Sequence, residues 1–199
     1  MIKDFPILEI DEVYHVGTMN KSCKRQDSME GSGLSVSQCP EAWMSINKFT
    51  GGDIIELRKI TGRFLDYLSL TEEQIQEIAF WGIVNQYIIP QKVYRVYSYV
   101  EEWDDEGYME FLTLEKAQEE TEGEESRLEE CDGYIATEKM CIEVMGHPDS
   151  SSVLSLLSTI FADKILGLDG VWWNETYAPE HLSAPRGVIF NDRVSEWII

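Results

Sequence analysis

The chain has 199 residues, of which 43% are hydrophobic and 11% aromatic, so it can build a packed core and is not wholly disordered. Its 37 acidic residues outweigh 16 lysines and arginines, for a net charge of -21. This balance excludes a protein that binds nucleic acid or anionic membranes through a basic face. The length predicts a single domain, residues 1–199.

Short strands and one helix are predicted in the first 52 residues. Residues 13–16 are a strand-like run, residues 17–31 are polar and predict a surface loop, and residues 33–37 alternate as a half-buried strand does. Pro40 suits a first helical turn. It predicts a helix that ends at the glycines 51–52, with Trp43 and Met44 on one side.

The middle of the chain begins with a strong helix signal. Thr71 and Gln74 form a capping box, and apolar residues follow at helical spacing up to Ile83. Residues 93–100 and 108–112 predict two paired strands around a turn at 103–107. Residues 114–128 contain good helix formers and predict a helix interrupted by Gly123.

The last third mixes strands with one long helix. Residues 137–143 predict a strand, and the serines 150–152 predict the cap of a helix over 153–165. Residues 166–173 predict a tight turn into a buried strand, in which Trp172 and Trp173 must point to opposite faces. Residues 187–190 predict a last strand. The whole pattern indicates an α+β fold.

The negative charge is concentrated in residues 101–132, which hold 15 acidic residues and only Lys116 and Arg127 as basic ones. Their net charge is -13, and the other 167 residues share -8. We expect this acidic segment to be an insertion. It is either a solvated helix face and loop, or a surface that attracts a basic protein partner.

The N-terminus, the apolar runs and the cysteines indicate the cellular compartment. The N-terminus lacks a signal-peptide pattern, and no apolar run reaches the roughly 18–20 residues of a membrane span. The cysteines have scattered spacing and form no Cys-x-x-Cys pair. We therefore expect a cytoplasmic protein with reduced thiols, no zinc site and no membrane partner.

Three separated segments carry residue types that suit a flat, ribose-containing ligand. A glycine at a strand end lets the backbone approach such a ligand closely, and hydroxyls can bind ribose or amide groups. A carboxylate just past a buried strand can hold a ribose hydroxyl and stabilise developing positive charge. The candidates are His15, Gly17 and Thr18 in the first segment, Ser35, Ser37 and Trp43 in the second, and Glu175 in the third.

In order and character these segments resemble the ADP-ribosyltransferase superfamily, in particular its small phage and bacterial members. The family has a first strand with His-Gly-Ser/Thr, a glycine–hydrophobic segment leading to an aromatic residue, a late strand that delivers an acidic residue, and a terminal Val-Ile-Phe-like strand. The match covers about residues 13–43 and 161–197, and leaves about residues 52–146 unplaced. The resemblance implies split, mostly antiparallel sheets with flanking helices, and NAD as the substrate.

The resemblance also implies a role for individual residues. His15 would bind the adenosine-side ribose, the backbone at Gly17 would hold the nicotinamide carboxamide, and Trp43 would stack on nicotinamide. Glu175 would bind the nicotinamide-ribose 2′-hydroxyl and stabilise an oxocarbenium-like transition state.

The chain departs from the family pattern in two places. Val16 separates His15 from the glycine, and the second-strand aromatic, usually Tyr, is replaced by Trp43 or by the serines 35 and 37. Asp169 is an alternative acidic residue, although Asp before Gly is typical of a turn.

Each candidate also has a purely structural interpretation. His15 can be a hydrogen-bonded structural histidine, Trp43 a core residue and Glu175 a solvated loop residue, while Arg186 suits an ion pair with a carboxylate.

Three functional hypotheses follow. The first is transfer of ADP-ribose from NAD to a macromolecular target, most simply a protein. The second is a non-enzymatic acidic inhibitor that engages a basic partner. The third is hydrolysis of NAD without transfer.

Overall fold

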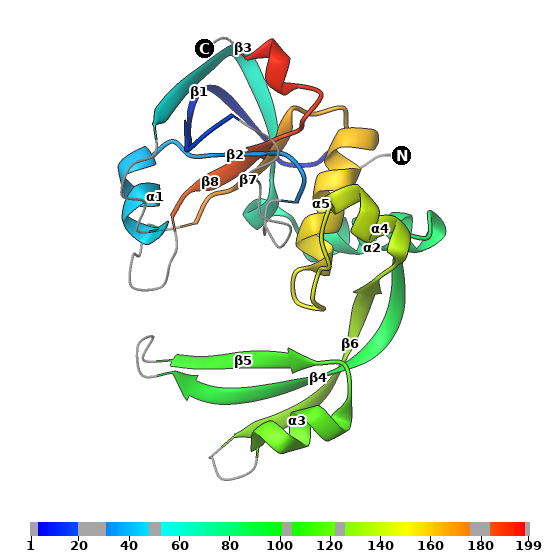
Figure 1. Ribbon diagram of the computed structural model, residues 1–199. Coiled ribbons are helices and arrows are strands. Elements are labelled where there is room, and N and C mark those ends of the chain that lie inside the picture. Colours follow the sequence, from blue (N-terminus) through cyan, green and yellow to red (C-terminus); the bar gives the residue numbers. More distant parts are fainter. Residues whose placement is uncertain are drawn as a thin grey trace.

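Two β-sheets organise the chain (Figure 1). The computed structural model describes residues 4–19, 31–47, 53–100, 105–121, 126–175 and 184–197. The five-stranded sheet has the order β1 (Ile7–Val16), β3 (Ile54–Asp66), β7 (Gly170–Trp173), β8 (Arg186–Ile189) and β2 (Leu34–Val36). The three-stranded sheet has the order β5 (Asp105–Phe111), β4 (Ile88–Val100) and β6 (Arg127–Ala136).

The five-stranded sheet is closed on itself. Its β3–β7 pair is parallel, whereas the β1–β3, β7–β8 and β8–β2 pairs are antiparallel. The edge strands are joined because the Tyr14 N–H donates to the Ser37 carbonyl at 2.8 Å, and the Ser37 N–H donates to the Tyr14 carbonyl at 2.9 Å. This bridge joins the edge strands at one residue pair and gives the sheet an inner and an outer face.

Each face of this sheet has its own apolar cluster. The inner cluster contains Phe64, Trp172 and Trp197, and the outer one contains Leu65, Trp173 and the apolar side of α5 (Val153–Lys164). The adjacent tryptophans therefore point to opposite faces, as predicted, and both are buried. The outer cluster is covered by helices, which confirms the α+β class.

The described residues form four further helices: α1 (Pro40–Asn47), α2 (Glu72–Val84), α3 (Leu114–Thr121) and α4 (Glu138–Val144). Short 3₁₀ turns lie at Tyr67–Ser69 and Val194–Glu196. The predicted capping box at the start of α2 is confirmed, since Thr71 and Gln74 exchange side-chain to backbone hydrogen bonds. None of the helices that the structure describes is long and apolar enough to cross a membrane.

Residues 137–143 were predicted as a strand, and this prediction is wrong, because residues 138–144 form α4. The Thr137 hydroxyl caps this helix by accepting from the Met140 N–H. Met140 and Val144, four residues apart, are buried, whereas Ile142 is 70% exposed. Burial at i and i+4 is the helical period, and alternation alone had suggested a strand.

The predicted helix over 114–128 is wrong at its end. The helix α3 ends at Thr121, and β6 begins at Arg127. Leu128 pairs with Val96 of β4, so non-local pairing overrides the local helix propensity there. The 13-residue strand β3 was not predicted. Residues 20–30, in the predicted surface loop, and residues 101–104, at the predicted turn, lie outside the described part.

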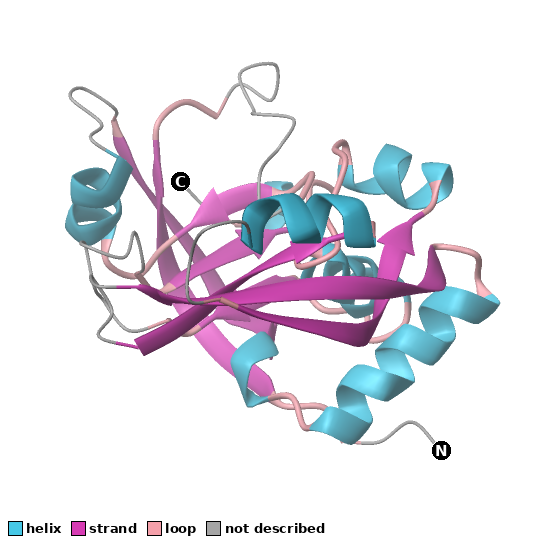
Figure 2. Ribbon diagram, turned by 90° about the horizontal axis from the view of Figure 1, so that it is seen from below, coloured by secondary structure: helices cyan, strands magenta, loops and turns pink. Residues whose placement is uncertain are grey.

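The acidic segment lies within the connection between β3 and β7. A parallel pair needs a long crossover, and this one contains α2, the three-stranded sheet, α4 and α5. Figure 1 shows α3 on the side of the three-stranded sheet that faces away from the five-stranded sheet. Figure 2, seen from below, shows α3 in front of those strands. The other face of the three-stranded sheet therefore looks toward the five-stranded sheet.

Candidate functional site

Residues from all three predicted segments meet where β1, β2, β7 and β8 approach one another. His15 Nδ1 lies 2.8 Å from the Ser35 carbonyl oxygen, which joins the first segment to the second. The Ser37 hydroxyl donates to the Pro185 carbonyl at 2.7 Å, which joins the second segment to the start of β8. Arg186 then donates to Glu175 at 3.0 Å. Closure of the sheet makes this chain of contacts, because β1 and β2 are its edge strands.

His15 organises the end of β1. Its Nδ1 faces the Ser35 carbonyl, and its Nε2 lies 3.1 Å from the Thr18 carbonyl. The ring thereby ties β2 to the residues that follow β1. Gly17 has φ +128°, a backbone conformation that favours glycine, and its N–H donates to the Asp53 carbonyl at 2.9 Å. The contact of His15 with Thr18 and the hydrogen bond of Gly17 to Asp53 therefore hold the turn at the end of β1.

The two serines of the second segment differ in burial and in the hydrogen bonds they make. Ser37 is buried, and its hydroxyl donates to Pro185 and accepts from the Cys39 N–H at 3.0 Å, so its hydroxyl is engaged within the protein. Ser35 is half-buried and gives its carbonyl to His15. Trp43 is half-buried in α1, directly after β2. The hydrogen bonds described above do not join Trp43 to the other candidates.

Glu175 lies two residues beyond β7, and its side chain is 25% exposed. The expected ion pair of Arg186 is confirmed, and Glu175 is the partner. The Arg186 guanidinium is 13% exposed and stacks over Trp173, with its carbon 5.1 Å from the ring centroid. Trp173 is held in turn by its Nε1–H, which donates to the Ser155 hydroxyl at 3.0 Å. The carboxylate is thus positioned by a guanidinium that rests on a fixed indole.

Tyr67 extends this arrangement, and sequence reasoning missed it. Its ring centroid is 6.1 Å from that of Trp173. Burial raises the pKa of the Tyr67 hydroxyl, the hydrogen bond with Ser155 opposes the rise, and the Tyr108 hydroxyl of β5 adds to it. The Tyr67–Trp173 contact joins residues more than 100 positions apart, so no local pattern could have indicated it.

Asp169, the alternative acidic residue, serves the fold. Its carboxylate accepts from Lys59 Nζ at 2.5 Å and from the Arg63 N–H at 2.8 Å, and it is buried. Burial lowers the pKa of Lys59, but hydrogen bonds to Asp169 and Glu196 outweigh this and raise it. Asp169 therefore ties β3 to the start of β7.

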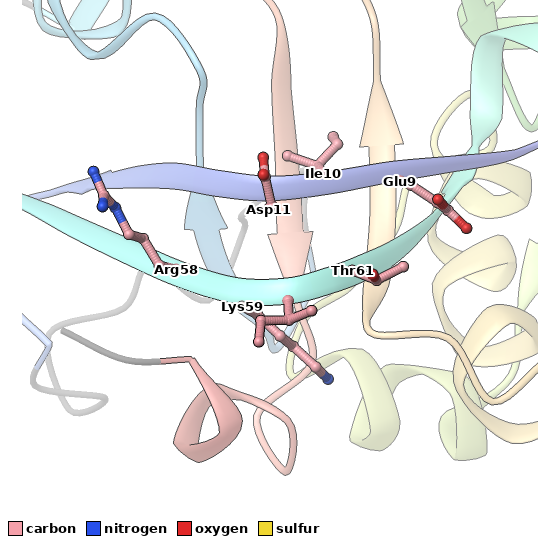
Figure 3. Close-up of a pocket in the computed structure, with 7 residues that line it drawn as sticks. Glu9, Ile10, Asp11, Arg58, Lys59 and Thr61 are labelled. Carbon is pink, nitrogen blue, oxygen red and sulfur yellow. The ribbon is translucent and has the colours of Figure 1, made fainter.

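A hollow of about 500 Å³ lies elsewhere, on the β1–β3 pair (Figure 3). The register shifts there, because Asp11 stands opposite residues 59–61 of β3. Thr61 adopts φ +61°, and the neighbouring Ile60 is 95% exposed. Neither His15 nor Glu175 lines this hollow.

Within the described ranges, no group of three histidine, cysteine, aspartate or glutamate side chains is arranged to hold a metal ion. Comparison with known proteins gives no assignment either. No protein-family model, no curated protein and no solved structure matches this chain.

Proposed function

We propose that this chain binds NAD at the junction of β1, β2, β7 and β8 and transfers ADP-ribose to a protein. One observation supports the proposal most directly: hydrogen bonds join the three predicted segments. His15 contacts the Ser35 carbonyl, and Ser37 donates to the Pro185 carbonyl. Arg186, the next residue, donates to Glu175. The third segment lies more than 100 residues from the first two in the chain, and the order of the three along it is the order in the ADP-ribosyltransferase superfamily.

The buried carboxylate of Glu175 suits the chemistry of ADP-ribose transfer. Transfer breaks the bond between nicotinamide N1 and ribose C1′, and nicotinamide leaves with the electron pair. The acceptor nucleophile then forms a bond to C1′ and loses a proton. Positive charge develops on the ribose in the transition state, so a preorganised carboxylate lowers the barrier without acting as a nucleophile. Glu175, three-quarters buried and held by Arg186, is such a carboxylate.

The other candidates would bind the substrate. The turn formed by His15, Gly17 and Thr18 lies at the end of β1, where a glycine allows close approach to a flat ring. In this proposal His15 positions the binding turn, because both of its ring nitrogens face carbonyl oxygens of the protein, those of Ser35 and Thr18. Trp43 would stack on nicotinamide from α1.

The test compares NAD turnover in wild type, Glu175→Ala and a matched control. Glu143→Ala is the control, because Glu143 is also a partly exposed carboxylate, paired with Lys164 at 2.6 Å, but on α4. With labelled NAD, we expect Glu175→Ala to lower the rate by about 100-fold or more, and Glu143→Ala to stay within about twofold. Equal rates for wild type and Glu175→Ala would remove Glu175 from the mechanism.

Binding and product analysis complete the experiment. Calorimetry that detects no NAD binding by wild type at millimolar NAD would refute the proposed function itself. Free ADP-ribose as the only product, with no labelled protein, would replace transfer by hydrolysis.

A further inference from the structure

The face of the three-stranded sheet opposite α3 carries an unusual set of side chains. Alternation along paired strands places Arg95, Tyr97 and Tyr99 of β4, Glu106 and Tyr108 of β5, and Arg127 of β6 on this face. We call it the tyrosine face. Val96, on the other side of β4, is buried, and so is Ala117 of α3.

Contacts within the protein hold side chains of the tyrosine face in place. The Arg127 guanidinium lies 3.9 Å from the Tyr97 ring centroid, and that of Arg95 lies 4.8 Å from the Tyr108 centroid. The Tyr97 and Tyr108 rings are themselves 5.5 Å apart. Arg95 also pairs with Glu110 at 2.9 Å, and the Glu110 side chain is only 5% exposed. Rings fixed in this way lose little conformational freedom when a partner binds.

The rings are also accessible. Tyr99 is 60% exposed and Tyr108 is 50% exposed. The solvated face of an antiparallel sheet is normally polar, so three tyrosines on adjacent strands are unexpected there. Tyrosine and arginine are the residues that dominate binding energy at protein interfaces.

Charge points to a basic partner. Arg127 is shared by Glu106 at 3.0 Å and Glu129 at 3.1 Å, and both carboxylates remain about half exposed. Glu106, Glu110 and Glu129 lie on the tyrosine face with Arg95 and Arg127, so these residues of the face have an excess of one negative charge. The stacked Arg95 and Arg127 show the geometry in which an incoming guanidinium or ammonium would lie on these rings. Nucleic acid is disfavoured by the same charge.

The tyrosine face lies beside the candidate site. It looks toward the five-stranded sheet (Figure 1), where Tyr67 packs against Trp173. Burial raises the pKa of Tyr67, and the Tyr108 hydroxyl on the tyrosine face adds to the rise. We propose that the tyrosine face binds a lysine- and arginine-rich segment of the protein that accepts ADP-ribose. Naming the partner as the acceptor rests on the proposed function, whereas the binding surface itself does not.

The first experiment measures binding of fluorescein-labelled protamine, an arginine-rich probe, by fluorescence anisotropy. We expect Tyr99→Ala with Tyr108→Ala to weaken binding about tenfold, and Tyr99→Ala alone to weaken it by a smaller factor. Phe80→Ala is the control, because Phe80 is 68% exposed on α2, and its affinity should stay within about twofold of wild type. Circular dichroism checks that each variant is folded.

A second pair of variants separates specific contacts from bulk attraction. Glu106→Gln with Glu129→Gln on the tyrosine face should weaken binding about fivefold. Glu115→Gln with Glu119→Gln on α3 removes the same charge from the opposite side of the sheet, and should change affinity less than twofold. Equal weakening by the two pairs, or no protamine binding by wild type, would overturn the inference.

The same variants distinguish this inference from the proposed function. NAD affinity of the tyrosine variants, measured by calorimetry, should equal that of wild type. Loss of NAD affinity together with protamine affinity would show that the face binds nucleotide, and would overturn the inference. If wild type binds protamine at this face but no NAD, the proposed function fails while the binding surface stands.

Discussion

Replacement of Gly170 by alanine tests how closely β7 packs against β8 and Phe64 inside the five-stranded sheet. A Cβ at this position would lie 1.8 Å from the Val188 carbonyl oxygen, and 2.8 and 2.9 Å from two atoms of the Phe64 ring. Contact distances for such atoms are about 3.5 Å, so β7 and β8 must separate by more than an ångström. Neither neighbour can yield, because Phe64 is buried and Val188 belongs to the β7–β8 ladder.

The expected loss of stability has two parts. Overpacking of a tight interior costs about 1–3 kcal/mol, and the displaced ladder loses one or two hydrogen bonds of about 1 kcal/mol each. The sum is about 2–5 kcal/mol, which for a chain of this length lowers Tm by roughly 4–20 °C. Thermal unfolding followed by circular dichroism and by tryptophan fluorescence measures this, since Trp172 and Trp173 lie in the affected strand.

Gly167→Ala is the control. A Cβ there meets no atom within 4 Å, but φ is +61°, so only backbone strain of about 1 kcal/mol is expected. A Gly170→Ala variant that melts within about 2 °C of wild type would refute the close packing of β7 against β8 and Phe64.

Two further predictions concern charged groups. The Asp149 carboxylate accepts a hydrogen bond from the Ser152 N–H at the start of α5. Burial raises the pKa of Asp149, but hydrogen bonds from Ser152 and Ser151 outweigh burial and hold the pKa below the ordinary value of 3.8. Because the folded-state pKa is depressed, the stabilisation is complete above pH of about 5 and is lost as pH falls through the folded pKa. Asp149→Ala should therefore destabilise by about 1 kcal/mol at neutral pH, and urea midpoints should converge with wild type below pH of about 3. At the candidate site, Arg186→Met and Glu175→Gln are combined in a double-mutant cycle measured by urea unfolding. We expect a coupling free energy of about 0.5–1 kcal/mol from the ion pair. Additive effects of the two substitutions would contradict the pairing.

Local signals predicted what local physics controls. The capping box at Thr71, the proline start of α1 at Pro40, and the opposed faces of Trp172 and Trp173 depend on residues a few positions apart, and each agrees with the structure. The same reasoning was wrong at residues 137–143 and beyond Thr121, where one pattern suits more than one structure and tertiary contacts decide between them.

The candidate site shows the same division. Its residue types could be selected from the sequence, because hydroxyls, a histidine beside a glycine, and a carboxylate after a buried strand are chemically distinctive. No local sequence pattern indicates the aromatic contacts of the site. These are the contact of Tyr67 with Trp173, the support of Arg186 by the Trp173 indole, and the facing tyrosines of β4 and β5.

The sequence by itself determined the α+β class, the position of the best helix and the concentration of -13 of the -21 charges in one segment, because composition and short-range periodicity are written directly in residue order. Only the tertiary structure decided that Tyr14 meets Ser37 and closes the sheet, and that Glu175 pairs with Arg186. It also decided that the acidic segment, with β4, forms a sheet with tyrosines on one face. These contacts form between distant residues, and their energy depends on packing that no short window of sequence contains.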